Sequence, residues 1–173
     1  MTTALAGDLG NVETMKYRAI WKKATSGGSA ILPGKVVKLT ESTGVGALAP
    51  TTAGLVGPFG VVPRLAPVNV DSDDTFQVIT GGEIYVTADG AIKPNQRVMP
   101  STSTAGEVVA YVAPAASASP TQAEVNTAAE AQQKIVGIYL GHVDEGSGLT
   151  NEATDAADGQ VIRILLGNKG EAP

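Results

Sequence analysis

Two stretches of this 173-residue chain repeat the same series of short motifs, and the repeat constrains the fold more than any other feature. Residues 30–37 read AILPGKVV, and residues 91–98 read AIKPNQRV. A Ser-Thr turn follows each stretch, at 42–44 and at 103–106. Proline and glycine favour turns, and the valines that follow them favour strands. Each stretch therefore predicts a turn that leads into a strand and then into a second turn.

The repeat continues beyond the second turn. The sequence ALAP at 47–50 resembles AYVAP at 110–114, and LVGPFG at 55–60 resembles IVGIYLG at 135–141. The second copy carries residues 113–133 as an insertion. In the Val-Gly strand of each copy, glycine permits a close backbone approach or a bulge. We expect the two copies to pack around one core, although two unrelated stretches of low-complexity β sequence would also match.

The composition favours an all-β fold. Twenty-one glycines and ten prolines interrupt the chain too often for long helices. The apolar residues are mainly Val, Ile, Leu and Ala, and branched aliphatic side chains favour half-buried pleated surfaces. We predict a compact β-barrel or β-sandwich of about nine to ten short strands from two related halves. The strand candidates are 16–23, 35–39, 46–49, 58–62, 75–80, 83–87, 97–99, 107–112, 134–143 and 160–166.

Turn and cap signals define the local structure in two places. Gly81 and Gly82 separate two strand candidates by two residues, which predicts a tight β-hairpin. The insertion 113–133 is poor in large apolar residues and cannot contribute much to a core. Ser119, with Pro120 directly after it and Gln122 three residues on, predicts the start of a short helix near 120–133. A disordered Ala/Ser-rich linker would have the same composition.

The predicted domain organisation is a single β-rich domain at 15–173 preceded by an N-terminal arm at 1–14. The arm shows neither helical nor strand periodicity, so we expect it to be mobile unless something binds it. Residues 144–159 are polar and acidic, which indicates a long loop.

Charge is distributed unevenly along the sequence. Residues 1–64 hold seven Lys and Arg against three Asp and Glu, a net charge of +4, and residues 65–173 hold five against fourteen, a net charge of −9. Nucleic-acid binding needs a clustered basic face, so we do not expect it. The basic end could dock on an acidic protein surface or be an ordinary solvated face. No apolar stretch approaches the roughly 18 residues that cross a bilayer, so we expect no membrane partner.

No arrangement of residues predicts catalysis, a metal site or a bound cofactor. The chain has no cysteine, and its single histidine, His142, lies in an apolar strand candidate with no serine nucleophile motif of the Gly-x-Ser-x-Gly kind. The run 71–74 resembles the start of a calcium loop, but the later positions that need glycine and glutamate hold other residues. Acidic pairs at 144–145 and at Asp155 with Asp158 lie in polar sequence, where carboxylates are usually solvated.

Six elements follow one another in an order that is typical of one protein family. They are the stretch 30–37, GPFGVV at 57–62, the stretch 75–87, the stretch 91–98, VGI at 136–138 and GQVIRILL at 159–166. This order, over roughly residues 16–167, resembles the head decoration or capsid cement proteins of tailed bacteriophages. The insertion 113–133 and the loop 144–159 depart from the shorter members of that family.

The resemblance implies a non-enzymatic structural protein of the virion. Such a protein binds the outside of the capsid and stabilises it by bridging subunits of the major capsid protein, its partner. The resemblance also implies a homo-oligomer, with a trimer as the first expectation and a dimer as the alternative, that is made in the host cytoplasm and needs no cofactor. A tail or fibre component would share the composition but would show longer repeats. A carbohydrate-binding β module would need several exposed aromatic side chains.

On this interpretation we expect the arm 1–14 and the first basic strand to reach the capsid. The predicted capsid-contact residues are Lys16, Arg18, Trp21, Lys22 and Lys23.

Overall fold

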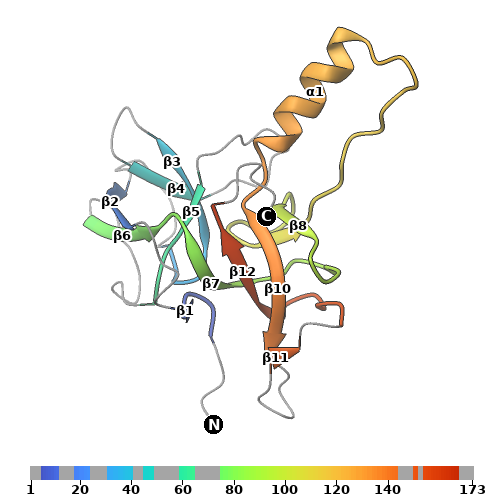
Figure 1. Ribbon diagram of the computed structural model, residues 1–173. Helices are drawn as coiled ribbons and strands as arrows, with labels where there is room; N and C mark the ends of the chain where they lie inside the picture. Colours follow the sequence, from blue (N-terminus) through green and yellow to red (C-terminus); the bar gives the residue numbers. More distant parts are fainter. Residues whose placement is uncertain are drawn as a thin grey trace.

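The computed structural model describes residues 5–11, 18–23, 31–40, 45–48, 59–64, 75–143, 150–151 and 154–167. These residues form twelve strands and one helix, so the all-β prediction is confirmed (Figure 1). The elements are β1 (Leu9–Asn11), β2 (Arg18–Lys23), β3 (Val36–Thr40), β4 (Val45–Leu48), β5 (Phe59–Val61), β6 (Thr75–Ile79), β7 (Gly82–Thr87), β8 (Arg97–Pro100), β9 (Val108–Ala110), α1 (Gln122–Gln132), β10 (Gly137–Val143), β11 (Thr150–Asn151) and β12 (Val161–Leu166). All the predicted strands are present, and β1 and β11 are additional.

The first half of the chain forms a closed barrel of five strands in the order β2-β4-β3-β5-β6. β2 pairs antiparallel with β6 and parallel with β4, and β3 lies antiparallel between β4 and β5. The barrel closes where Val61 of β5 lies opposite Ile79 of β6. In β6, buried Phe76 and Val78 alternate with exposed residues, as expected for a strand with one face inside the barrel.

The second half repeats this arrangement. Its strands form a sheet in the order β1-β7-β12-β10-β8-β9, and β11 pairs with the end of β10. One parallel bridge, between Ala88 and Val108, joins the end of β7 to β9. The path β7-β12-β10-β8-β9 therefore returns to its start, and each strand has the same neighbours as a strand of the barrel. β7 corresponds to β2, β9 to β4, β8 to β3, β10 to β5 and β12 to β6.

The strand registers correct the alignment of the two copies. Val37 of β3 lies opposite Gly60, and Val98 of β8 lies opposite Gly137. Gly60 is therefore the counterpart of Gly137, whereas the sequence comparison matched Gly57 with Gly137 and was wrong by three residues. The match between 47–50 and 110–114 was wrong by one residue, because Leu48 and Ala110 are the residues opposite Val37 and Val98.

The Pro-led turn has the same geometry in both halves. In the turns 32–35 and 93–96, the N–H of the fourth residue donates to the carbonyl of the first, at 3.4 and 3.0 Å. The third residue has a positive φ angle in each, 81° at Gly34 and 60° at Asn95. Glycine and asparagine are the residues that adopt this conformation most readily.

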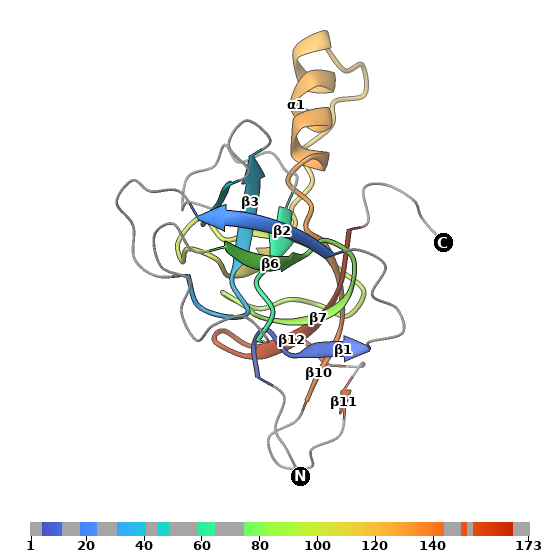
Figure 2. The ribbon, with the colours of Figure 1, turned by 90° about the vertical axis from the view of Figure 1, so that its left-hand side faces the viewer.

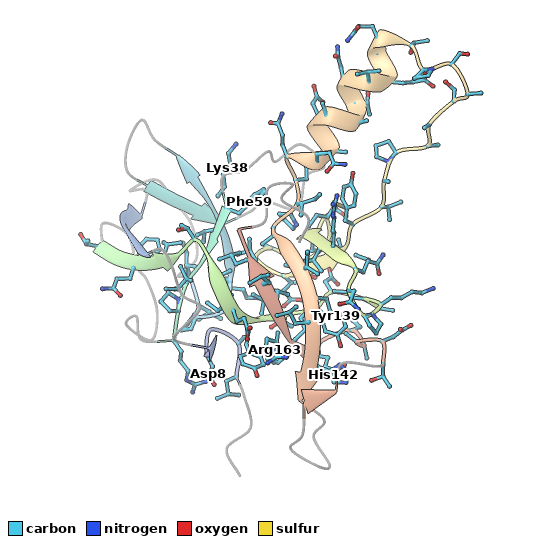
Figure 3. All side chains as sticks on the ribbon, viewed as in Figure 1. Asp8, Lys38, Phe59, Tyr139, His142 and Arg163 are labelled. Carbon is cyan, nitrogen blue, oxygen red and sulfur yellow. The ribbon has the colours of Figure 1, made fainter. Side chains whose placement is uncertain are left out.

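The two halves share a core. A cluster inside the first barrel consists of Ile31, Val37, Val62, Phe76 and Val78. A larger cluster fills the second half and also contains four residues of the first half, Val36, Phe59, Val61 and Ile79. Val36 and Val61 neighbour Val37 and Val62 in the sequence, so they lie on the other face of their strands. The outer face of the first barrel is therefore buried against the second half, and Figure 3 labels Phe59 and Tyr139 of this shared cluster.

Gly81 and Gly82 do not form the predicted hairpin. β6 pairs with β2 and β5, whereas β7 pairs with β1 and β12, so the two strands belong to different sheets. The two glycines instead carry the chain from the first barrel into the second half, with Gly82 at a φ of 96°. The Gly-Gly pair indicated a turn correctly. The strands on either side of it, however, pair with strands that are distant in the sequence and not with each other.

The predicted arm is part of the fold over residues 5–11. Gly7 is buried, its N–H donates to the carbonyl of Tyr85 at 2.7 Å, and its carbonyl accepts the N–H of Arg64 at 2.8 Å. Gly7 has a φ of 87°, and a Cβ there would lie 2.7 Å from the backbone nitrogen of Gly34. This segment is thus held between the two halves, and the prediction of a mobile arm is wrong for it. The rest of the arm lies outside the described residues.

The predicted loop 144–159 also contains regular structure. β11 extends the sheet beside β10, and Ala156 is buried and forms an antiparallel bridge with Ile92. The sequence did not indicate this contact, because Ala156 is one of two small residues between Asp155 and Asp158 in a polar stretch.

The insertion contains the predicted helix, but a different residue caps it. Thr121, and not Ser119, is the N-cap of α1: its side chain accepts the N–H of Glu124, and the Glu124 carboxylate accepts the N–H of Thr121 at 2.7 Å. This reciprocal capping box satisfies two backbone donors at once. No residue of α1 is buried, and the helix stands away from the body of the protein (Figures 1 and 2).

Candidate interaction surfaces

The predicted capsid-contact residues gather on one strand of the first barrel. Arg18, Trp21, Lys22 and Lys23 lie in β2, and Lys16 lies outside the described residues. The strand is held on both sides, by β6 along its length and by β4 at its end.

The register of β2 distinguishes these positions. Trp21 lies opposite buried Phe76 of β6, whereas Lys22 lies opposite exposed Thr75. Residues opposite each other on paired strands are close neighbours. Among the predicted contact residues in β2, Lys22 is therefore the one that lies beside a solvent-exposed residue of β6.

Residues 112–133 form an appendage that contributes nothing to the core. Val112 is 74% exposed, and Val125 in α1 is 47% exposed. Near its base, the side-chain oxygen of Gln132 accepts a hydrogen bond from Arg97 at 3.2 Å. The sequence predicted the lack of core residues here, but not that the segment would project as a capped helix.

The appendage is acidic. It contains Glu124 and Glu130 and neither Lys nor Arg. Hydrogen bonds from the backbone and then the side chain of Thr121, followed by one from Ser117, lower the pKa of Glu124. Both the negative charge and the cap are therefore maintained at neutral pH.

A second exposed apolar surface lies where the N-terminal segment packs on the turn 32–35. We call it the N-terminal patch, which consists of Leu5, Leu32 and Arg64. Leu5 is 43% exposed and Leu32 is 48% exposed. They flank the place where Gly7 packs on Gly34, so they come from segments in direct contact.

Arg64 gives the N-terminal patch a positive charge that reaches solvent. Its backbone N–H is bonded to Gly7, and its side chain is 50% exposed. The guanidinium lies 3.8 Å from Asp8, a long separation for an exposed ion pair, which contributes little energy. The sequence did not predict this patch, because alternation does not reveal which apolar turn residues stay exposed.

Ionic and backbone contacts lock the two halves together. Lys35 of the first half forms a part-buried ion pair with Glu107 of the second, at 2.9 Å. The N–H of Val36 donates to the carbonyl of Gly106 at 2.8 Å. Gly106 has a φ of 80°, and a Cβ there would lie 2.8 Å from the Lys35 side chain, so glycine is required at this joint.

A polar cluster around Asp89 holds the turn between β8 and β9. Asp89 accepts hydrogen bonds from the hydroxyls of Ser101 and, at 2.7 Å, of Ser103. The buried Ser101 Oγ also accepts the N–H groups of Ser103 and Thr104, both at 2.9 Å. The hydrogen bonds that Asp89 accepts, first that from the Ser101 side chain and then that from the Ser103 side chain, lower the pKa of Asp89. The Ser101 hydroxyl is thus engaged in holding the turn.

His142 occupies the strand position that the sequence predicted. It is buried in β10, where its Nδ1 bonds to the hydroxyl of Tyr139 and the two rings lie 5° from parallel (Figure 3). Asp158 accepts the N–H of Gly90 at 3.1 Å, and Asp155 is exposed. Within the described ranges, no three His, Asp or Glu side chains gather where they could hold a metal ion. The acidic runs at 71–74 and 144–145 lie outside those ranges.

Comparisons with known proteins give no further assignment: no protein-family model matches the chain, and no curated protein matches it. Among the described residues, no helix has the length and apolar character needed to cross a membrane.

Proposed function

We propose that the protein is a decoration or cement protein of a tailed-phage head, which binds the outside of the capsid and bridges subunits of the major capsid protein. The observation that carries the proposal is the fusion of two equivalent barrels through one shared core. The motifs that resemble the cement family lie on the corresponding strands of these barrels, including β3, β5, β8 and β10.

A cement protein acts through summed contacts, without a chemical reaction. It must keep its contact surfaces at fixed separations while the shell beneath it is under load. The shared core, the Lys35–Glu107 ion pair and the glycines at the joint hold the halves in one arrangement. If several copies associate, later contacts form at high effective concentration, so individually weak contacts give firm attachment.

The first contact surface in this proposal is the basic strand β2, which would face acidic groups on the capsid. The segment 5–11 stabilises the fold through Gly7, so removal of the whole arm would damage the body together with any contact surface. Charge reversal is therefore a cleaner test than truncation.

The proposal is tested by mixing the purified protein with undecorated heads and imaging them by electron cryomicroscopy. We expect ordered density on the outer surface and heads that resist heat better than bare ones. Heads that stay bare at every protein concentration and at low salt would contradict the proposal.

Charge-reversal variants locate the contact. Lys22→Glu should weaken head binding at least tenfold, about 1.4 kcal/mol, because an attractive charge becomes repulsive. Lys93→Glu is the matched control, since Lys93 is an exposed lysine of the second half. Equal binding by both variants would remove β2 from the contact while leaving the head-binding function intact.

A further inference from the structure

Four large apolar side chains are exposed among the residues whose burial the structure describes, and they fall in two regions. Two of them, Val112 and Val125, lie on the appendage, and the other two, Leu5 and Leu32, lie in the N-terminal patch. The other large aliphatic residues whose burial the structure describes are buried or partly buried. Exposed apolar surface of this kind often marks an interaction site.

α1 has the properties of a helix that needs a partner. An isolated helix of 11 residues is marginal in water even with a good cap, and most helices are stabilised by packing one face against another element. No residue of α1 is buried, so the described part of the chain does not supply that packing. Val125 is the large apolar residue that the helix offers.

The charges of the two regions are complementary. α1 carries Glu124 and Glu130 with no basic residue, whereas the N-terminal patch presents the half-exposed Arg64. The wider sequence has the same polarity, with +4 over residues 1–64 and −9 over residues 65–173. Opposite charges around an apolar contact favour association and fix its orientation.

The two regions cannot meet within one molecule. In both views α1 projects from one end of the body, and β1, which follows Leu5, lies at the other (Figures 1 and 2). We propose that the appendage of one copy docks through Val125 on the N-terminal patch of a second copy of this chain. Each copy then offers one appendage and accepts another.

This arrangement joins two different surfaces, so it is a head-to-tail interface. Such interfaces close into a ring when the rotation between copies permits and otherwise continue as a filament. A single short helix gives an interface at the low end of the known range, below ~1,200 Å². We therefore expect weak association of one pair, with a dissociation constant on the order of micromolar or higher, and much firmer association in a closed ring.

Crosslinking gives a direct test because the natural chain has no cysteine. Val125→Cys and Leu32→Cys are made as separate proteins, one is labelled with ¹⁵N, and the two are mixed with a short bismaleimide. The proposal predicts a mixed-mass dimer, which can form only between copies, and little dimer from either variant alone. Val112→Cys, near the base of the appendage, is the matched control and should crosslink to Leu32→Cys much less.

Two results would overturn the proposal. One is the absence of the mixed product at protein concentrations near 1 mM, with sedimentation as a monomer. The other is a Val125→Cys protein that crosslinks to itself as efficiently as to Leu32→Cys, which would indicate a symmetric contact between appendages.

Charge substitutions distinguish a second copy from another occupant of the appendage. Val125→Asp and Leu32→Asp should each shift the sedimentation equilibrium toward monomer at least tenfold, and added salt should act in the same direction. If Val125→Asp sediments like the natural protein but decorates heads less, the capsid protein occupies the appendage and the proposal is wrong.

Discussion

The two barrels share a strand order, a Pro-led turn and a close-packed glycine. They differ in how far the outer faces of the corresponding strands are buried. In the first barrel the outer face around Val36, Phe59 and Val61 is buried against the second half. Of the corresponding positions in the second half, Arg97 is exposed and Ile138 is only partly buried, whereas Val136 is buried in the shared core. A repeated unit can thus keep its backbone while its two copies diverge in what their outer faces contact.

The same contrast appears in single residues. A side chain on Gly60 would meet the side chain of Val78, whereas one on Gly137 would meet the backbone carbonyl of Leu165. Gly34 is pressed against Ala6, whereas Asn95 in the equivalent turn is exposed. At these positions the first half excludes a larger residue mainly because neighbouring side chains and the N-terminal segment pack there. The second half excludes one at Gly137 because a paired strand backbone lies close.

The largest expected effect is that of Gly137→Ala. The new Cβ would meet a strand carbonyl that cannot rotate away, so we expect a loss of at least ~3 kcal/mol in the free energy of unfolding, measured with urea. Gly60→Ala should cost less and should be partly rescued by Val78→Ala, because the clash there is with a side chain. A Gly137→Ala protein as stable as the natural one would contradict the close approach of β10 and β12 at this position.

Exchanging the turn residues should have unequal effects. Gly34→Asn is expected to cost about 2 kcal/mol because its Cβ would press on Ala6, while Asn95→Gly should change stability by less than ~1 kcal/mol. Thermal unfolding of both variants measures the difference. Equal costs would mean that the two turns occupy equivalent surroundings, contrary to the contrast between the halves.

The Asp89 cluster predicts that the free energy of unfolding depends on pH through a group in the second half. The pKa of Asp89 is lowered by its hydrogen bonds, so its contribution to stability is present above the ordinary aspartate pKa and is lost as the pH falls through the lowered folded value. Ser101→Ala should cost about 1–2 kcal/mol at neutral pH and should reduce the loss of stability below about pH 4. The neighbouring Thr102 is exposed and provides the control, and Thr102→Ala should change neither. An unchanged acid profile in Ser101→Ala would exclude Asp89 as its source.

The smallest effect on the body should come from Thr121→Ala. Loss of the N-cap destabilises a helix by about 1 kcal/mol, but no residue of α1 is buried against the described part of the chain, so the unfolding midpoint of the body should not move. Hydrogen exchange should become faster in residues 122–132 alone. A lower midpoint for the whole protein would mean that the appendage supports the barrels.

The sequence was informative where the determinants are local. The Pro-led turns and the capped helix each depend on a few consecutive residues, and alternation located the strands. Which strands pair depends on residues that are distant in the sequence. The stretch 55–60 contains both Gly57 and Gly60, and only the pairing with Val37 shows that Gly60 is the counterpart of Gly137. Gly81 and Gly82 failed as a hairpin for the same reason.

The candidate surfaces were less accessible to sequence reasoning. Alternation placed a basic strand at 16–23, and the structure brings Arg18, Trp21, Lys22 and Lys23 onto β2. No sequence pattern predicted the N-terminal patch. Leu5 and Leu32 are apolar residues of the kind expected in a core, and only the packing of Gly7 on Gly34 shows where they lie. Whether an apolar residue lies in a core or on a surface is decided by such long-range contacts.

The central claim is that two copies of one barrel share a core and behave as a single rigid body. Trp21, the only tryptophan, lies in β2 of the first barrel, so its fluorescence reports on that half during urea unfolding. We predict that Gly137→Ala, in the second half, lowers the Trp21 midpoint as much as the midpoint measured by circular dichroism. A Trp21 transition that stays at its natural position while the rest of the protein unfolds earlier would contradict the claim.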